Sequence, residues 1–599
     1  MNDPPALQVS NTTTTTDNAT PPIVSSRSRL PELRASLRVS DGASKRLSAT
    51  AEAQSLSIRR GSSKVKHRGG LETYITCLIE DLRYSLTELN ATGVTDRRLE
   101  DWAILIHGCL SVDTRSFHSV HHVFEISGGC DAIQLLAACF RDTISYSTDG
   151  QLTKKQEELV AGVVEHSARG PKLLSGMGMG SGGHSSSSSS SSSSPTSPSS
   201  SSAAAVSSQY CDEDDEMALL VVMDVFGLTP GQMLGRYPGL DVFLSAVLTT
   251  RVFRKTLTLA QLVQIVTCME ATIAFRPPVN GETALERLYR RLQEVTDKFE
   301  LDLSEDDIVK TIQRATDLSN RNLGNFASHD ATVFLDHTWS LLPERSDALR
   351  RSFLYTVNDM LLATRDMERM MTDIEAGRIF QSFRGVPEED EMDEFHQQTN
   401  QNLTKGRTYL RAKLLSICVL SGFAVVTGGD TPMSFFCGDL GGNNSNNNSQ
   451  STTPAIQDQQ DTLSQPPSPP LSRSSSPLQS SQEQQRPNRL GASLPVFSLD
   501  EAIRNGCDMD VYQIMTGGRK REQVFDHRDD PLASFFYAQL GDEGVRKALA
   551  KCSFPMHKFA AKALLKHLPA EAVKMVGYEI GKIALTRTEG IHAFLETLP

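Results

Sequence analysis

Apolar residues recur at intervals of three and four along most of the chain, which places them on one face of an α-helix. Between residues 71 and 86, for example, Tyr74, Leu78 and Leu82 repeat in this way, and the Thr92-Gly93 pair closes the element. No stretch in the first half of the chain alternates apolar and polar residues over several positions, as a half-buried strand would. The pattern therefore predicts an all-α fold.

The same spacing predicts a series of further helices. Ser304 is the expected N-cap of the helix that carries Asp317, and Ser498-x-x-Glu501 matches a capping box. A Met-rich face on the helix over 349–383 suits either an adaptable binding groove or ordinary core filling. The other expected helices cover residues 97–110, 117–126, 131–143, 154–166, 217–226, 240–253, 259–275, 282–301 and 410–426.

Three low-complexity regions divide the chain, and their compositions cannot build a core, so we expect them to be disordered. They are a basic Ser/Thr-rich tail over 1–70, a serine-rich spacer over 170–212, and a linker over 441–491 that is rich in Asn, Gln, Ser and Pro. Between them we expect a helical domain made of 71–169 and 213–383, and a helical extension over 384–440 that begins with a solvated acidic connection. A C-terminal helical block over 492–599 either packs on the main domain or stands alone.

Composition and charge narrow the class of protein. A net charge of −12 over 599 residues argues against generic nucleic-acid binding. Ten cysteines without a Cys-x-x-Cys pair suit reduced thiols in a cytosol-like compartment. We find no apolar run of membrane-spanning length and no secretory signal, and therefore expect a soluble cytoplasmic protein without a membrane span. Organellar targeting stays open, because the tail is rich in Arg and Ser.

Candidate chemistry is concentrated between Phe117 and Tyr146. On a helix over 117–126, His118 and His122 would share one face, so that two imidazoles could converge on one point. The apolar helix that follows delivers Asp142 to its inner end, where a buried carboxylate needs a partner. These residues are typical of metal ligands or acid–base groups.

The pattern Phe-His-x-x-x-His-x-x-acidic-hydrophobic, followed after a turn by Leu-Ala-Ala-x-Phe-x-Asp, resembles the HD superfamily of metal-dependent phosphohydrolases. A later phrase, Arg-Ala-Thr-Asp-Leu-Ser-Asn at 314–320, resembles the family's final ligand segment. The resemblance covers at best residues 71–383 without the serine-rich spacer. It implies that His118 is the proton donor, that His122, Asp142 and Asp317 bind a divalent metal (Mn, Fe, Zn or Mg), and that His118 and Asp142 are catalytic.

Arg141 stands where the family has the His of its His-Asp pair. A guanidinium is always protonated and has no lone pair, so one ligand is lost and a positive charge takes its place. At an effective dielectric of about 20 and a separation of roughly 5 Å, a +1 and a +2 charge repel by about 6 to 7 kcal/mol. We expect Arg141 either to pair with Asp142 or Asp317 in a metal-free ionic cluster, or to hold a phosphate or other anion.

Other polar groups are candidates for lining the same pocket. Glu125 can share a helix face with His121, and Glu270 lies on an otherwise apolar helix, where it either reaches the site or sits at an exposed edge. Downstream of Asp317, a polar cluster could orient a ligand or line a pocket mouth. Its members are Asn320, Arg321, Asn322 and Asn325.

Two functions follow. We rank first a degenerate, non-catalytic phosphohydrolase-like protein that binds or regulates through an anion-binding pocket, with no metal. The alternative is an active metal-dependent phosphohydrolase of the phosphodiesterase or nucleotide phosphohydrolase class, with His118 as general acid. The expected partner is a protein of unknown identity or a phosphorylated small molecule.

Overall fold

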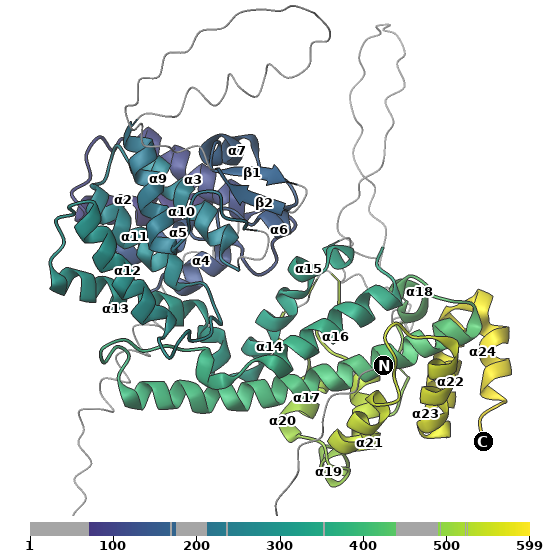
Figure 1. The fold of residues 1–599 in the computed structure, drawn as a ribbon. Helices are drawn as coiled ribbons and strands as arrows, with labels where there is room; N and C mark the ends of the chain where they lie inside the picture. The colour runs from purple at the N-terminus through teal and green to yellow at the C-terminus, as the bar shows by residue number, and fades with distance from the viewer. Residues whose placement is uncertain are drawn as a thin grey trace, which may run out of the picture. The chain divides into compact units, whose positions relative to one another are not determined.

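The computed structural model describes residues 71–167, 170–174, 213–234, 238–350, 354–438, 489–491, 493–521, 523 and 525–599. The predicted tail and most of both predicted spacers lie outside these residues. In the described part, the all-α prediction is confirmed, because helices alternate with short connections and the named strands form one two-stranded sheet (Figure 1).

The first half of the described chain builds one hydrophobic core, which we call the N-terminal lobe. Its buried apolar residues run from Leu78 to Leu318, with Phe383 added from downstream. Helix α5 is buried at every position and contacts α2, α4, α11 and α13. The helices of this lobe are α2 (Leu71–Glu88), α3 (Asp96–Leu110), α4 (Val120–Ile126), α5 (Ala132–Phe140), α6 (Tyr146–Asp149), α7 (Lys154–Val160), α9 (Glu213–Phe226), α10 (Leu240–Phe253), α11 (Leu259–Ala271), α12 (Ala284–Lys298) and α13 (Glu305–Asn322).

A β-hairpin replaces the end of the helix predicted over 154–166. Helix α7 stops at Val160, and strand β1 (Val164–Ser167) then pairs antiparallel with β2 (Gly170–Leu173). Gly162 has a φ of 74°, which a right-handed helix cannot continue. Leu173 is 1% exposed, so the start of the predicted serine-rich spacer belongs to the fold.

The second half builds a separate core from Leu323 to Leu598, which we call the C-terminal lobe. Helix α17 runs through it and contacts α16, α21 and α22 most extensively (Figure 1). The C-terminal block therefore packs on α17. The elements are η2 (Gly324–Ala327), α14 (Ala331–Ser340), α15 (Leu342–Arg345), η3 (Asp347–Arg350), α16 (Val357–Asp373), η4 (Ala376–Arg378), α17 (Glu389–Thr427), α18 (Met433–Cys437), α19 (Leu499–Arg504), α20 (Met509–Gly517), α21 (Pro531–Leu549), α22 (Lys558–His567), α23 (Ala570–Ile583), η5 (Leu585–Arg587) and α24 (Thr588–Leu595).

Several predicted boundaries need correction here. The single helix predicted over 349–383 is wrong, because α16 starts only after the N-cap Thr356 and ends at Asp373, where Ile374 is extended. The acidic connection before residue 394 is the first turn of α17, where carboxylates interact favourably with the helix dipole.

The methionines at 360, 367 and 371 are buried in the core, as ordinary core filling requires. The expected capping residues Ser304 and Ser498 are confirmed.

Helix α17 also corrects the expectation that no segment is long and apolar enough to cross a membrane. Among the described residues, this helix alone meets that test by length and composition. Its apolar part is mostly buried, because α16, α21 and α22 cover it. This is how the core helix of a soluble protein behaves.

Candidate functional site

His118 lies before helix α4 rather than on it. The helix begins at Val120 with Ser119 as its N-cap, so the predicted four-residue helical spacing of His118 and His122 is wrong. The two rings nevertheless lie edge to face with their centroids 6.0 Å apart. The turn before the helix brings them together.

A buried carboxylate from the C-terminal lobe holds this turn. Glu344 of α15 accepts hydrogen bonds from the backbone N–H groups of Phe117 (2.7 Å) and His118 (2.9 Å), and its other oxygen lies 2.6 Å from Nδ1 of His118. Ser116 adds a hydrogen bond of 2.5 Å from its hydroxyl to the carbonyl of Ser340. The site therefore joins the two lobes, and Glu344 is a central residue that the sequence did not identify.

Arg141 forms the centre of the site and is 4% exposed. Its Nη1 lies 2.9 Å from the carboxylate of Asp142 and donates a hydrogen bond of 2.5 Å to the side-chain oxygen of Asn322. The Nε2 of His122 lies 3.2 Å from the same oxygen. An amide oxygen only accepts hydrogen bonds, so His122 presents an N–H there rather than a lone pair. We call His118, His122, Arg141, Asp142, Asn322 and Glu344 the histidine cluster.

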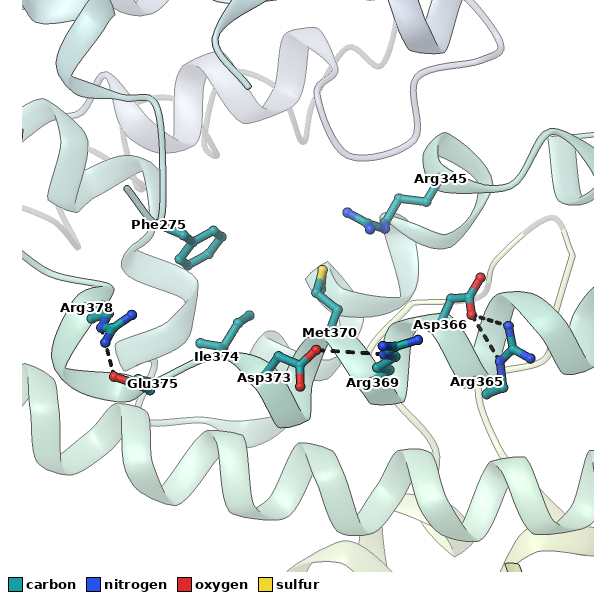
Figure 2. Close-up of a pocket in the computed structure, with 10 residues that line it drawn as sticks. All are labelled: Phe275, Arg345, Arg365, Asp366, Arg369, Met370, Asp373, Ile374, Glu375 and Arg378. Atoms are coloured by element: carbon teal, nitrogen blue, oxygen red, sulfur yellow. Dashed lines mark hydrogen bonds and ion pairs between the residues drawn. The ribbon is translucent and has the colours of Figure 1, made fainter. Parts of the chain in front are cut away.

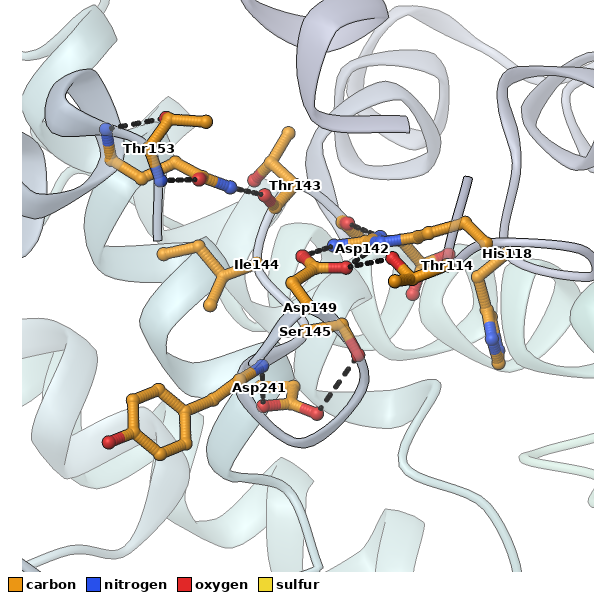
Figure 3. A network of polar contacts seen from close by, with 12 residues as sticks. Thr114, His118, Asp142, Thr143, Ile144, Ser145, Asp149, Thr153 and Asp241 are labelled. Atoms are coloured by element: carbon orange, nitrogen blue, oxygen red, sulfur yellow. Dashed lines mark hydrogen bonds and ion pairs between the residues drawn. The ribbon is translucent and has the colours of Figure 1, made fainter. Parts of the chain in front are cut away.

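A second arginine fixes the backbone of the cluster. Arg115 is buried and donates hydrogen bonds to the carbonyl of Asp142 and to the carboxylate of Asp149, the latter at 2.6 Å and 2.9 Å. Thr114 donates to the same carboxylate at 3.2 Å (Figure 3).

The loop that follows Asp142 is tied to the rest of the N-terminal lobe. The backbone N–H of Tyr146 donates to Asp241 of α10 at 2.8 Å (Figure 3). The backbone N–H of Ile144 donates to the hydroxyl of Ser245 at 2.9 Å. The carbonyl of Thr143 accepts from Gln156 at 2.6 Å. These bonds hold Asp142 in a fixed position beside Arg141.

Opposite charges set the protonation states in the cluster. Burial lowers the pKa of His118, but Asp142 and Glu344 outweigh it, so this pKa lies above its ordinary value. Burial would raise the pKa of Asp142, but Arg141 and His118 bring it below its ordinary value. For Glu344, the hydrogen bond with His118 likewise outweighs burial and lowers the pKa. The pKa of His122 is lowered, chiefly because the ring is buried.

Glu125 lies at the edge of the cluster with several basic groups around it. Its carboxylate is 3.1 Å from His121, 3.4 Å from His122, 3.6 Å from His337 of α14 and 3.5 Å from Arg521. Burial would raise its pKa, but the neighbouring histidines, His121 first among them, bring it well below its ordinary value. Glu125 therefore gives a second contact between the lobes.

The structure does not bring Asp317 to His122 and Asp142. Its carboxylate accepts hydrogen bonds from Gln134 and Arg321, both at 2.8 Å, and its side chain is 38% exposed. Gln134 lies at the start of α5 and Arg141 at its end, roughly 10 Å apart along the helix axis. Asn322, from the same helix as Asp317, takes the place in the cluster where we expected Asp317.

Glu270 and Asn320, two further candidates, have structural contacts elsewhere. Glu270 is fully buried and pairs with Arg276 at 2.5 Å and with Arg291, so it occupies neither the site nor an exposed edge. The side-chain amide of Asn320 hydrogen-bonds both backbone groups of Gln381, at 2.8 Å and 3.0 Å.

The donor set of the cluster does not fit a divalent metal. His122 faces Asn322 with an N–H, Asp142 is paired with Arg141, and the Arg141 guanidinium would repel a cation. Among the residues that the structure describes, no group of three or more His, Cys, Asp or Glu side chains is placed to hold a metal ion.

Comparisons of the chain with protein-family models, with curated proteins and with solved structures found no match. The resemblance to the HD superfamily therefore rests on the sequence motifs alone.

Proposed function

We propose that this chain is a non-catalytic, phosphohydrolase-like protein that serves a binding or regulatory role. The observation that carries the proposal is the buried ion pair of Arg141 with Asp142, closed by the hydrogen bond from Arg141 to Asn322. A permanent cation that is paired with a carboxylate stands where a metal ligand would be needed.

Hydrolysis would need side chains that are already paired with one another in this cluster. Asp142 would have to release Arg141 to act as a ligand or base, and His122 would have to lose its contact with Asn322. Removing one partner of a buried pair typically costs about 3 to 5 kcal/mol, which opposes such a rearrangement. An anion held by Arg141 itself is disfavoured for the same reason, because its charge is matched by Asp142.

A regulatory role agrees with the position of the cluster. His118 pairs with Glu344, and Glu125 contacts His337, so charged groups of the N-terminal lobe meet charged groups of the C-terminal lobe. A protein partner or small molecule that changes these contacts would change how the lobes are held together.

An assay with bis(p-nitrophenyl) phosphate and Mn²⁺ tests the proposal. The natural protein should hydrolyse this generic phosphodiester no faster than the Asp142→Ala variant does. Asp510→Ala, which alters an acid on α20, serves as a matched control. Turnover by the natural protein that Asp142→Ala abolishes and Asp510→Ala leaves intact would refute the non-catalytic proposal.

A further inference from the structure

A pocket of about 680 Å³ lies away from the histidine cluster, between α15, α16, η4 and the segment after α11. Its volume is within the range of about 300 to 1,000 Å³ that small-molecule sites usually have. Arg345 and Phe275 extend towards this space from opposite sides, with Met370 between them (Figure 2).

The charge of the lining is positive, with four arginines and three acidic residues. Three arginines have acidic neighbours: Arg365 pairs with Asp366 at 2.7 Å, Arg378 with Glu375 at 2.8 Å, and Arg369 reaches Asp373 only at 4.0 Å. Within the described part of the chain, Arg345 has no ion-pair partner. Its guanidinium is therefore available for a ligand.

The pocket also has an apolar side. Met370 and Ile374 are partly buried on the core of the C-terminal lobe, whereas Phe275 is 41% exposed. The Phe275 ring contacts Phe326 edge to face, with the centroids 6.0 Å apart. Phe275 has a φ of 59°, a conformation that a bulky L residue rarely adopts. The chain therefore holds an aromatic ring at the pocket in an unusual conformation.

We propose that this pocket binds a small organic anion with a planar apolar body and a phosphate or carboxylate group. The apolar body would lie against Phe275 and Met370, and the anionic group would receive charge-assisted hydrogen bonds from the Arg345 guanidinium. The inference goes beyond the function proposed above, because it concerns a different site and names a ligand class. It depends only on the pocket's own residues, so catalysis at the histidine cluster would refute the earlier proposal and leave this one standing.

Isothermal titration of the full-length protein with 1-naphthyl phosphate tests the inference. We expect one site, with binding at least about tenfold tighter than for neutral 1-naphthol or for inorganic phosphate. Arg345→Gln should weaken binding about tenfold, because it removes a charged donor that the anion would use. Phe275→Ala should reduce the preference for 1-naphthyl phosphate over inorganic phosphate. Arg97→Gln, an exposed arginine of α3, is the matched control and should bind like the natural protein.

Methyl NMR of the methionines locates the ligand, with Met370→Leu used to assign the Met370 signal. That signal should shift during the titration. The inference is overturned if 1-naphthyl phosphate does not bind, if it binds without moving the Met370 signal, if Arg345→Gln binds as tightly as the natural protein, or if 1-naphthol binds equally well.

Discussion

Two buried clusters of charges, one between the lobes and one within the C-terminal lobe, differ in composition and enclosure. In the C-terminal lobe, Lys413 and Arg519 meet Asp526 and Asp530, and all four side chains are at most 10% exposed. In the histidine cluster, by contrast, His118 is 31% exposed and is charged only when its imidazole is protonated. We call the four residues of the C-terminal lobe the lysine–arginine cluster.

The contacts of the lysine–arginine cluster show what a purely structural arrangement looks like. Arg519 donates to the hydroxyl of Tyr409 at 2.6 Å, and its guanidinium lies 4.7 Å from the ring centroid of Trp339. The Trp339 indole donates to Asp526 at 3.0 Å. These bonds tie the segment around residues 519–530 to α14 and α17 within one core. The histidine cluster instead joins two cores, and its His118 is partly exposed. A contact that responds to pH or to a binding partner requires such access.

The largest expected effect on stability comes from disrupting the lysine–arginine cluster. Asp526→Asn removes one of two buried carboxylates and leaves Lys413 and Arg519 with a single opposing charge. We expect the free energy of unfolding to fall by about 3 to 5 kcal/mol, as measured by urea denaturation. Asp510→Asn is the control, because its pair with Lys405 is partly exposed and should contribute about 1 kcal/mol or less. Equal effects of the two variants would contradict a structural role for the lysine–arginine cluster.

A smaller effect should appear in the pH dependence of stability. Because the pKa of His118 is raised in the folded protein, its contribution is complete below its ordinary pKa of about 6.5 and is lost as pH rises through the raised value. Glu344 and Asp142 have lowered pKa values, so their contributions are present above about pH 4 and are lost in acid. The contacts of His118 with Glu344 and Asp142 are therefore most stabilising between roughly pH 4.5 and 6.5.

Melting temperatures at pH 6 and pH 9 measure this difference. The pKa values of Lys413 and Arg519 are raised because Asp526 and Tyr409, respectively, outweigh burial, so the lysine–arginine cluster keeps its charges over this range. The natural protein should lose about 1 kcal/mol or less from the His118–Glu344 pair between the two pH values. Glu344→Gln should reduce that loss, whereas the exposed change Glu543→Gln should not. An unchanged pH profile in Glu344→Gln would show that the His118–Glu344 pair does not respond to pH.

Sequence was a good guide to features that depend on neighbouring residues. Helical periodicity placed a helix over 240–253 with the same limits as α10, and the caps at Ser304 and Ser498 were predicted from a few adjacent residues. The pairing of Arg141 with Asp142 was also among the expected arrangements, because a buried guanidinium and carboxylate seek one another.

Features that depend on distant residues could not be predicted. Glu344 reaches His118 across 226 residues of sequence, and no local pattern marks it. Asp317 and Asn322 share α13, but five residues turn a helix by about 140°, so they face different neighbours. Motif order alone cannot tell which of them reaches His122. The predicted position of His118 failed because contacts from Glu344, rather than a helix, hold it in place.

Metal titration of the natural protein tests the central claim most directly. After treatment with a chelator and dialysis, the protein would be equilibrated with Mn²⁺, Fe²⁺ or Zn²⁺, and its metal content measured by mass spectrometry beside that of Asp142→Ala. Since Arg141 is paired with Asp142 and Asn322, we expect both proteins to bind well below one metal ion per chain at this site, with no difference between them. One ion per natural chain, lost in Asp142→Ala, would contradict the account and would mean that Arg141 moves aside to admit the metal.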